Sequence, residues 1–89
     1  MDVTIISDKG HAWGIVTVEQ LKAARLSLDD ISEFSYKTPN GMILALEEDC
    51  DLPKYLNKLD SMGTQFNIRD SYIPNESHPD NPRNWARIR

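Results

Sequence analysis

The apolar residues of this chain fall into short runs separated by polar turns. Runs rich in β-branched or aromatic residues, or with apolar and polar residues in alternation, are typical of strands. We therefore expect strands near residues 3–6, 11–16, 34–37, 42–46 and 65–69. The run at 42–46 is apolar throughout, which favours a position in the middle of a sheet with both faces covered.

Two other segments show the spacing of an amphipathic helix. Thr17 and Gln20 have the spacing of a capping box, in which each side chain binds the backbone N–H of the other residue. Asp51 is expected to cap the second helix, just before Pro53 in its first turn. These signals predict helices over residues 18–26 and 52–62.

Taken in order, the elements predict one small α+β domain with the succession β-β-α-β-β-α-β. We expect an antiparallel-dominated sheet with both helices on one face, because 89 residues are too few for a second core. The domain should span residues 1–70, with a hairpin turn at 38–41. One core should contain Leu44, Leu46, Leu56, Leu59 and Phe66. Residues 71–89, rich in Pro and Asn, should form an irregular tail that folds back with Trp85 as its anchor.

Composition limits the environment and the partners. The net charge of −4 and pI of about 5.0 disfavour direct binding to nucleic acid or to an acidic membrane. One cysteine cannot form an internal disulfide, the N-terminus lacks a signal-peptide pattern, and no apolar run is long enough to cross a bilayer. We expect a cytoplasmic protein without a membrane segment. These features do not distinguish a monomer from a dimer.

A cluster of carboxylates at 47–51 is the main candidate for chemistry. Together with His11 or His78 it suggests an alternative function, a metal-assisted hydrolase or nuclease. However, consecutive side chains at a strand end point to opposite faces, and no metal-binding or phosphate-binding motif is present. The carboxylates beside Cys50 should raise the pKa of its thiol. We therefore expect no catalytic residue, no cofactor and no tightly bound metal.

Binding is the other class of function. Between Asp29 and Asp51 the chain has seven carboxylates and one lysine. Such a run is either a solvated face or a surface that binds a basic groove on another protein. Asp51 is excluded from this surface as a helix cap. The expected partner-binding residues are Asp29, Asp30, Glu33, Glu47, Glu48 and Asp49.

Three further residues are secondary candidates for the interface: His11, Trp13 and Trp85. Each also has a structural interpretation. A large aromatic residue such as Trp13 is commonly a core anchor, and a histidine is commonly held by hydrogen bonds.

Three blocks of sequence suggest a genetic setting: Gly10-His11-Ala12-Trp13, Phe34-Ser35-Tyr36 and Leu46-Glu47-Glu48-Asp49-Cys50-Asp51. This pattern resembles small uncharacterised proteins carried by phages and other mobile elements, although those have glycine where Ala12 stands. The resemblance implies an accessory role and no site residues. We expect a non-enzymatic protein that binds a basic surface of a host protein. It would act as an inhibitor of a nucleic-acid-handling defence system such as CRISPR or restriction, in the manner of a DNA mimic.

Overall fold

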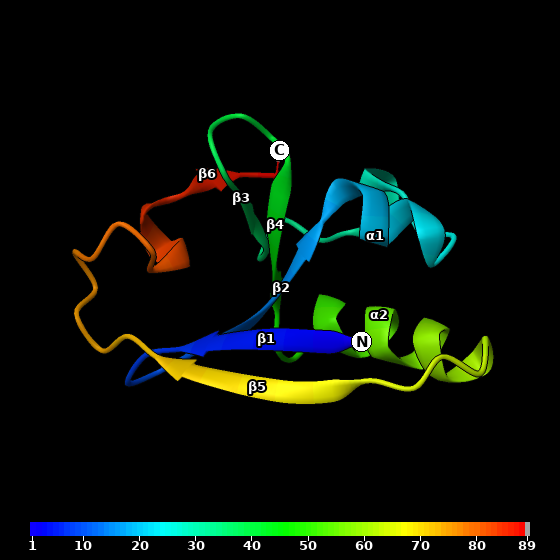
Figure 1. The fold of residues 1–89 in the computed structure, drawn as a ribbon. Coiled ribbons are helices and arrows are strands. Elements are labelled where there is room, and N and C mark those ends of the chain that lie inside the picture. Colours follow the sequence, from blue (N-terminus) through cyan, green and yellow to red (C-terminus); the bar gives the residue numbers. More distant parts are fainter. Residues whose placement is uncertain (89) are drawn as a thin grey trace.

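The computed structural model describes residues 1–88, which form a six-stranded sheet and two α-helices (Figure 1). The elements are β1 (Asp2–Ser7), β2 (Ala12–Thr17), α1 (Val18–Ala23), the 3-10 turn η1 (Leu28–Asp30), β3 (Tyr36–Lys37), β4 (Ile43–Glu47), α2 (Asp51–Ser61), β5 (Asn67–Tyr72), the 3-10 turn η2 (Pro82–Asn84) and β6 (Ala86–Arg87). The predicted α+β class is confirmed. No helix in the described residues is long and apolar enough to cross a membrane.

The strands lie in the order β5-β1-β2-β4-β3-β6. All neighbours are antiparallel except β1 and β5, so the sheet is mixed but mostly antiparallel. Strand β4 lies inside the sheet, and Leu44, Ala45 and Leu46 have no exposed surface. The apolar run at 42–46 therefore predicted a central strand correctly, and residues 44–46 are covered on both faces, but Met42 lies outside β4 and is 58% exposed.

Helix α1 begins as the sequence predicts. Thr17 Oγ1 accepts the backbone N–H of Gln20 at 3.0 Å, and Gln20 Oε1 accepts that of Thr17 at 2.9 Å. The helix ends at Ala23, before the predicted residue 26, and Arg25 has a left-handed φ of 62°. A non-glycine residue with positive φ cannot continue a helix, so α1 is short.

The prediction that Asp51 caps α2 is wrong. Cys50 holds the N-cap position and Asp51 is the first helical residue. The Asp51 carboxylate instead accepts the backbone N–H and hydroxyl of Ser32 and the hydroxyl of Ser35. Asp51 is fully buried, and it ties the segment before β3 to the start of α2. The contact joins residues far apart in the chain, so no local spacing indicates it.

Both helices pack against the same sheet face. Leu21 of α1 and Leu52, Tyr55 and Leu59 of α2 share one core with residues of the central strands, among them Val16, Leu44 and Leu46. Helix α2 comes very close to β2, since a Cβ on Gly14 would lie 2.2 Å from Leu52 Cδ1. The predicted core is right for Leu44, Leu46 and Leu59, whereas Leu56 and Phe66 are only partly buried at its edge.

The tail is less irregular than predicted. Strand β5 continues to Tyr72, past the predicted boundary at residue 70, and β6 adds to the sheet beside β3 (Figure 1). The chain does fold back, but Trp85 is only half-buried, whereas Asn81 and Pro82 are buried. Trp85 is therefore not the anchor of the tail. Hydrogen bonds between the segment around Asn81 and the rest of the domain hold the tail in place instead.

Replacing Tyr55 with phenylalanine is expected to raise the free energy of unfolding by about 1 kcal/mol. Tyr55 is fully buried, and its hydroxyl has no hydrogen-bond partner among residues 1–88. Folding therefore removes this hydroxyl from water without compensation. Urea unfolding measures the change, with Tyr72→Phe as the control because Tyr72 is 62% exposed. Destabilisation by Tyr55→Phe alone would mean that the hydroxyl has a partner in solution.

Candidate functional site

A hollow of about 420 Å³ lies beside the face of the sheet opposite the helices. We call it the tail-side hollow, because the returning tail forms one of its walls. Its residues come from the turn before β2, from β2, β3 and β4, from the loop before β3, from the turn before α2 and from the tail: His11, Trp13, Glu33, Phe34, Tyr36, Glu47, Asp49, Cys50, Arg83 and Arg87. The hollow combines aromatic, acidic and basic groups from distant parts of the sequence.

The pairing register of the strands determines which side chains form the floor of the hollow. Trp13 of β2 lies opposite Glu47 of β4, and Tyr36 of β3 lies opposite Ala45 of β4, so the side chains of Trp13, Tyr36 and Glu47 share one face. Trp13 is 2% exposed. The His11 ring stacks on it with centroids 6.0 Å apart, and the Tyr36 ring meets it edge-on at 6.4 Å. Trp13 thus belongs to an aromatic cluster outside the main core.

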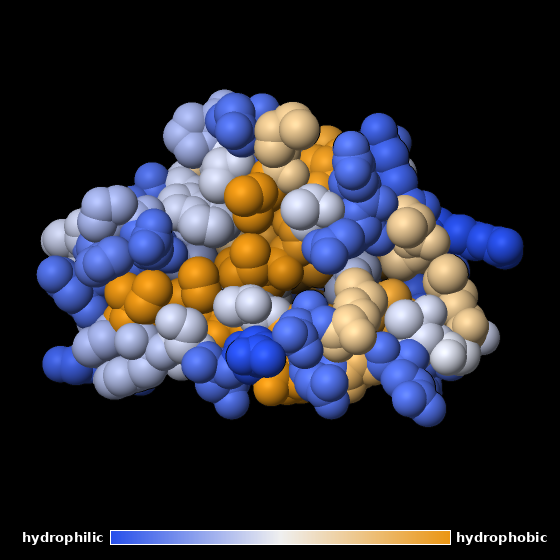
Figure 2. Space-filling model, in the orientation of Figure 1, coloured by the Kyte–Doolittle hydropathy of each residue, from blue (hydrophilic) through white to orange (hydrophobic). Residues whose placement is uncertain are grey.

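The surface near this region is partly apolar. Ile15 of β2 and Ile43 of β4 are only half-buried, and by strand alternation both lie on the side of Trp13. Figure 2 shows a band of apolar surface across the middle of the molecule, where β2 and β4 lie in Figure 1, with hydrophilic surface around it. The face without helices is therefore not a uniformly solvated surface.

The acidic wall contains one buried and two exposed carboxylates. Glu47 is 8% exposed, and its Oε2 accepts the backbone N–H groups of Asp49 and Cys50, both at 2.9 Å. Glu47 therefore shapes the turn that leads into α2. Glu33 and Asp49 are exposed and lie at the rim of the hollow.

Cys50 lies in the acidic wall with an exposed side chain. Desolvation raises the pKa of the thiol, and the carboxylates of Glu47, Asp51 and Asp49 raise it further. The structure agrees with the predicted direction. Because the thiolate is the nucleophilic form of cysteine, this environment opposes nucleophilic chemistry at Cys50.

The basic wall is held by a partly buried ion pair between Arg83 and Asp8. Arg83 Nε donates to Asp8 Oδ2 at 2.5 Å, and Asn81 Nδ2 donates to the same oxygen at 3.3 Å. The other carboxylate oxygen accepts the backbone N–H groups of Gly10 and His11. The hydrogen bond from Arg83 lowers the pKa of Asp8 far below its ordinary value, against the effect of burial. We call Asp8, Asn81 and Arg83 the tail latch.

Arg83 also contacts the aromatic floor. Its guanidinium lies 5.6 Å from the centroid of the Trp13 ring, within the range of a cation–π contact. Its Nη2 donates to His11 Nδ1 at 2.8 Å, since a guanidinium can only donate. The sequence pattern indicated His11 and Trp13 but not Arg83 and Asp8. The sequence shows that the tail is charged. It does not show which arginine of the tail pairs with which carboxylate of the domain.

The structure separates the six predicted acidic residues. Glu33, Glu47 and Asp49 line the tail-side hollow, and exposed Glu48 lies on the same turn. Asp30 lines a second hollow that Lys54 and Lys58 also line, and Asp29 lines a third with Lys22. The acidic run is thus distributed over several surfaces, some of which include lysines.

A metal-binding arrangement is present only in part. Glu47, Glu48 and Asp49 each have a possible ligand atom within 4.8 Å of the others. However, Glu47 Oε2 already accepts two backbone N–H groups, so the cluster would bind a cation mainly through two exposed carboxylates. Exposed acidic groups of this kind are common without a metal. The absence of a tightly bound metal stays a prediction.

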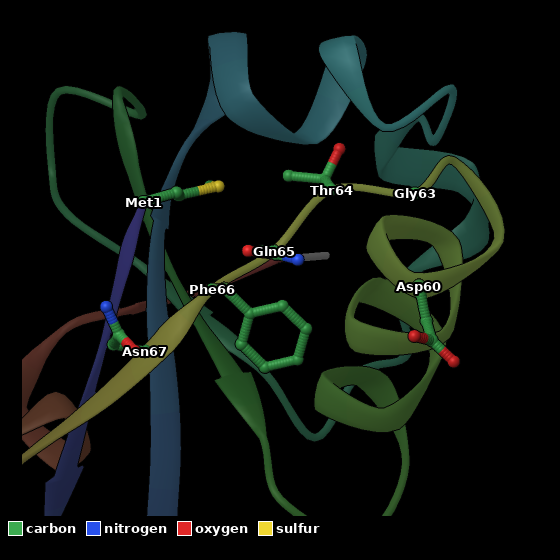
Figure 3. Close-up of a pocket in the computed structure, with 7 residues that line it drawn as sticks. All are labelled: Met1, Asp60, Gly63, Thr64, Gln65, Phe66 and Asn67. Carbon is green, nitrogen blue, oxygen red and sulfur yellow. The ribbon is translucent and has the colours of Figure 1, made fainter.

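A larger opening of about 660 Å³ lies between α2 and the start of β5 (Figure 3). Met1, Asp60, Gly63, Thr64, Gln65, Phe66 and Asn67 line it. In Figure 3 the Phe66 ring points toward α2, and the Asp60 carboxylate points away from the loop. None of the predicted site residues lies here. The tail-side hollow, with its convergent charged and aromatic groups, is the stronger candidate.

Comparison with known proteins identifies no relative: no protein-family model, curated protein or solved structure matches this chain. The geometry of the tail-side hollow is therefore the basis for the proposed function.

Proposed function

We propose that this protein is a non-enzymatic interaction protein that binds a basic segment of a partner protein in the tail-side hollow. The observation that carries this proposal is that exposed carboxylates and aromatic rings meet in one hollow. Glu33 and Asp49 supply the negative charge, and Phe34, which is 58% exposed, supplies an apolar surface beside them. This combination suits the long stem and charged head of an arginine or lysine side chain.

The protein's own tail supports this chemistry. Arg83 already places a guanidinium over Trp13 and against a carboxylate in one wall of the hollow. An incoming basic side chain would use the opposite wall in a similar way, with Phe34 and Tyr36 as its aromatic neighbours. The hollow is open and has polar groups at its rim, as expected of a site for part of a macromolecule.

The proposed partner class follows from charge. Proteins that handle nucleic acids have grooves rich in lysine and arginine, and a negatively charged surface competes with phosphates for those side chains. We propose that the partner is a host protein of this kind and that binding inhibits it, in keeping with the resemblance to proteins of phages and mobile elements. The surface involved is smaller than the whole acidic run, because Asp29 and Asp30 lie in other hollows.

The test is calorimetric titration with an arginine-rich peptide at low and at physiological salt. The double substitution Glu33→Lys with Asp49→Lys should weaken binding by about tenfold or more, which corresponds to about 1.4 kcal/mol. The matched control is Glu19→Lys with Asp60→Lys, which changes the net charge equally at two exposed carboxylates outside the hollow. Phe34→Ser should also weaken binding while leaving the domain folded, since Phe34 is exposed.

The two sets of variants distinguish a site from a general charge effect. If both double variants weaken peptide binding equally, only the net charge matters, and the proposal of a specific hollow fails. If the Glu33 and Asp49 variant stays folded and binds with unchanged affinity, the hollow is not the interface. Affinity should fall as salt rises, because exposed charge pairs are screened.

A further inference from the structure

Strand β5 forms one outer edge of the sheet. It pairs with β1 on one side, and in the described residues no strand pairs with its other side. All six of its residues, Asn67–Tyr72, are exposed. A long uncovered edge presents backbone donors and acceptors that another strand can bind.

The hydrogen bonds at its two ends show which backbone groups are free. Asn67 N–H donates to the Met1 carbonyl at 2.8 Å, and Ile73 N–H donates to the Ser7 carbonyl at 2.7 Å. Bonding groups alternate along a strand, so the odd-numbered residues from 67 to 73 face β1. The N–H and C=O groups of Ile68, Asp70 and Tyr72 must therefore point outward from the sheet.

The same three residues place their side chains on one face. Ile68 is 47% exposed and Tyr72 is 62% exposed, and Asp70 lies between them on the strand. The edge thus presents an apolar, an acidic and an apolar side chain at alternate positions. Arg69 is on the other face, where it pairs with Asp2.

We propose that β5 binds an extended segment of a partner protein as an added strand, with an apolar–x–basic–x–apolar pattern. The basic residue would lie opposite Asp70 and the two apolar residues opposite Ile68 and Tyr72, which matches both charge and polarity. The pattern reads the same in both directions, so it fits either strand orientation. This surface is separate from the tail-side hollow and does not depend on the function proposed there.

A second copy of the chain is a poorer occupant. Two antiparallel β5 strands related by a twofold axis pair Ile68 with Tyr72 only if Asp70 lies directly opposite Asp70 of the second copy. Like charges directly opposite one another destabilise a strand pair. Shifting the pairing to centre on Arg69 places two arginines opposite one another, and centring it on Ser71 places Asp70 opposite Tyr72 without a basic partner. A strand with a basic residue opposite Asp70 avoids the like charges and also pairs the carboxylate.

The experiment measures amide hydrogen exchange of the full chain during titration with a short peptide of sequence Thr-Val-Thr-Lys-Thr-Val-Thr. At a peptide concentration about ten times its dissociation constant, exchange at Ile68, Asp70 and Tyr72 should slow by about tenfold. Arg69 and Ser71 should change little, because their N–H groups already bind β1. A matched peptide with Glu in place of Lys should bind more weakly.

Proline substitutions test the backbone argument. Asp70→Pro removes an outward N–H, so the fold should persist while protection of Ile68 and Tyr72 by the peptide is lost. Ser71→Pro removes an N–H that faces β1 and should destabilise the domain. If Asp70→Pro does not fold, Asp70→Lys serves instead, and it should reverse the preference between the Lys and Glu peptides.

Three outcomes would overturn the proposal. The first is unchanged exchange at Ile68, Asp70 and Tyr72 at saturating peptide or at its solubility limit. The second is a folded Asp70→Lys variant that keeps the original peptide preference. The third is protection of the same amides by concentration of the protein alone, which would assign the edge to a second copy. The Glu33 and Asp49 variant should bind the Lys peptide normally, so failure at one surface is distinguishable from failure at the other.

Discussion

Replacing Asp51 with alanine is expected to lower the free energy of unfolding by about 4 kcal/mol, since hydrogen bonds to a charged group contribute about 1.5–3 kcal/mol each. Its carboxylate is fully buried and accepts from Ser32 and Ser35 at distances from 2.5 to 3.1 Å. Ser35 Oγ in turn accepts the backbone N–H of Glu47 at 2.9 Å. Alanine leaves the buried Ser35 hydroxyl and the half-buried Ser32 donors without their acceptor. Urea unfolding followed by circular dichroism measures the loss.

Asp49→Ala is the control for this substitution, because Asp49 is a nearby aspartate with an exposed side chain. It should change stability by no more than about 0.5 kcal/mol. A similar small loss with Asp51→Ala would show that the serine hydroxyls find other partners and that the link between α2 and the segment before β3 is dispensable.

Asp51 also makes stability depend on pH. Burial by itself would raise the pKa of this carboxyl, but the hydrogen bonds from Ser32 and Ser35 and the charge of Lys54 outweigh it, so the pKa lies below the ordinary 3.8. A lowered pKa in the folded state means that the stabilisation is present above the unfolded-state pKa. It is lost as pH falls from about 4 toward the folded-state pKa. The Asp51→Ala variant should lose less stability over this pH range.

Arg83→Met is expected to lower the free energy of unfolding by about 2 kcal/mol, within the range for losing a hydrogen bond to a charged group, because the ion pair with Asp8 is only partly buried. The Asp8 side chain is 1% exposed, whereas that of Arg83 is 31% exposed. Methionine keeps much of the apolar stem but leaves the Asp8 carboxylate with only neutral donors. Thermal and urea unfolding measure the loss.

The control for the tail latch is Arg87→Met, which alters an exposed arginine of the same tail. It should have little effect on stability. The double variant Asp8→Asn with Arg83→Met should be more stable than Arg83→Met alone, because it removes the unpaired buried charge. If the double variant is as unstable as the sum of the two single losses, Asp8 and Arg83 do not act as a pair.

The latch also connects stability to the proposed binding site. Arg83 covers the Trp13 ring and forms one wall of the tail-side hollow. The hydrogen bond from Arg83 lowers the Asp8 pKa, so the latch is intact at neutral pH and weakens only well below pH 4. The hollow should therefore keep its basic wall throughout the physiological range.

The local signals in the sequence determined where most elements begin and what class of fold they form. Thr17 and Gln20 determined the start of α1 because their hydrogen bonds lie within one helical turn. The apolar run at 42–46 indicated the central strand, since a strand covered on both faces has no polar positions. The apolar stripe from Leu52 to Met62 indicated α2 and its buried residues Leu52, Tyr55 and Leu59, whereas Leu56 is only partly buried and Met62 is exposed. Each of these depends on neighbours within a few residues.

Only the tertiary structure decided what the charged residues do. The sequence favoured Asp51 as a helix cap, but it is the first residue of α2, and its carboxylate accepts hydrogen bonds from Ser32 and Ser35 across the fold. Glu47 belongs to the acidic run of the sequence, yet its side chain is buried in the fold. Its carboxylate accepts hydrogen bonds from two backbone N–H groups of the following turn. Asp8 and Arg83 are 75 residues apart and meet only because the tail returns. A long-range contact depends on which distant segments the fold brings together, and the spacing of residues within one segment does not determine this.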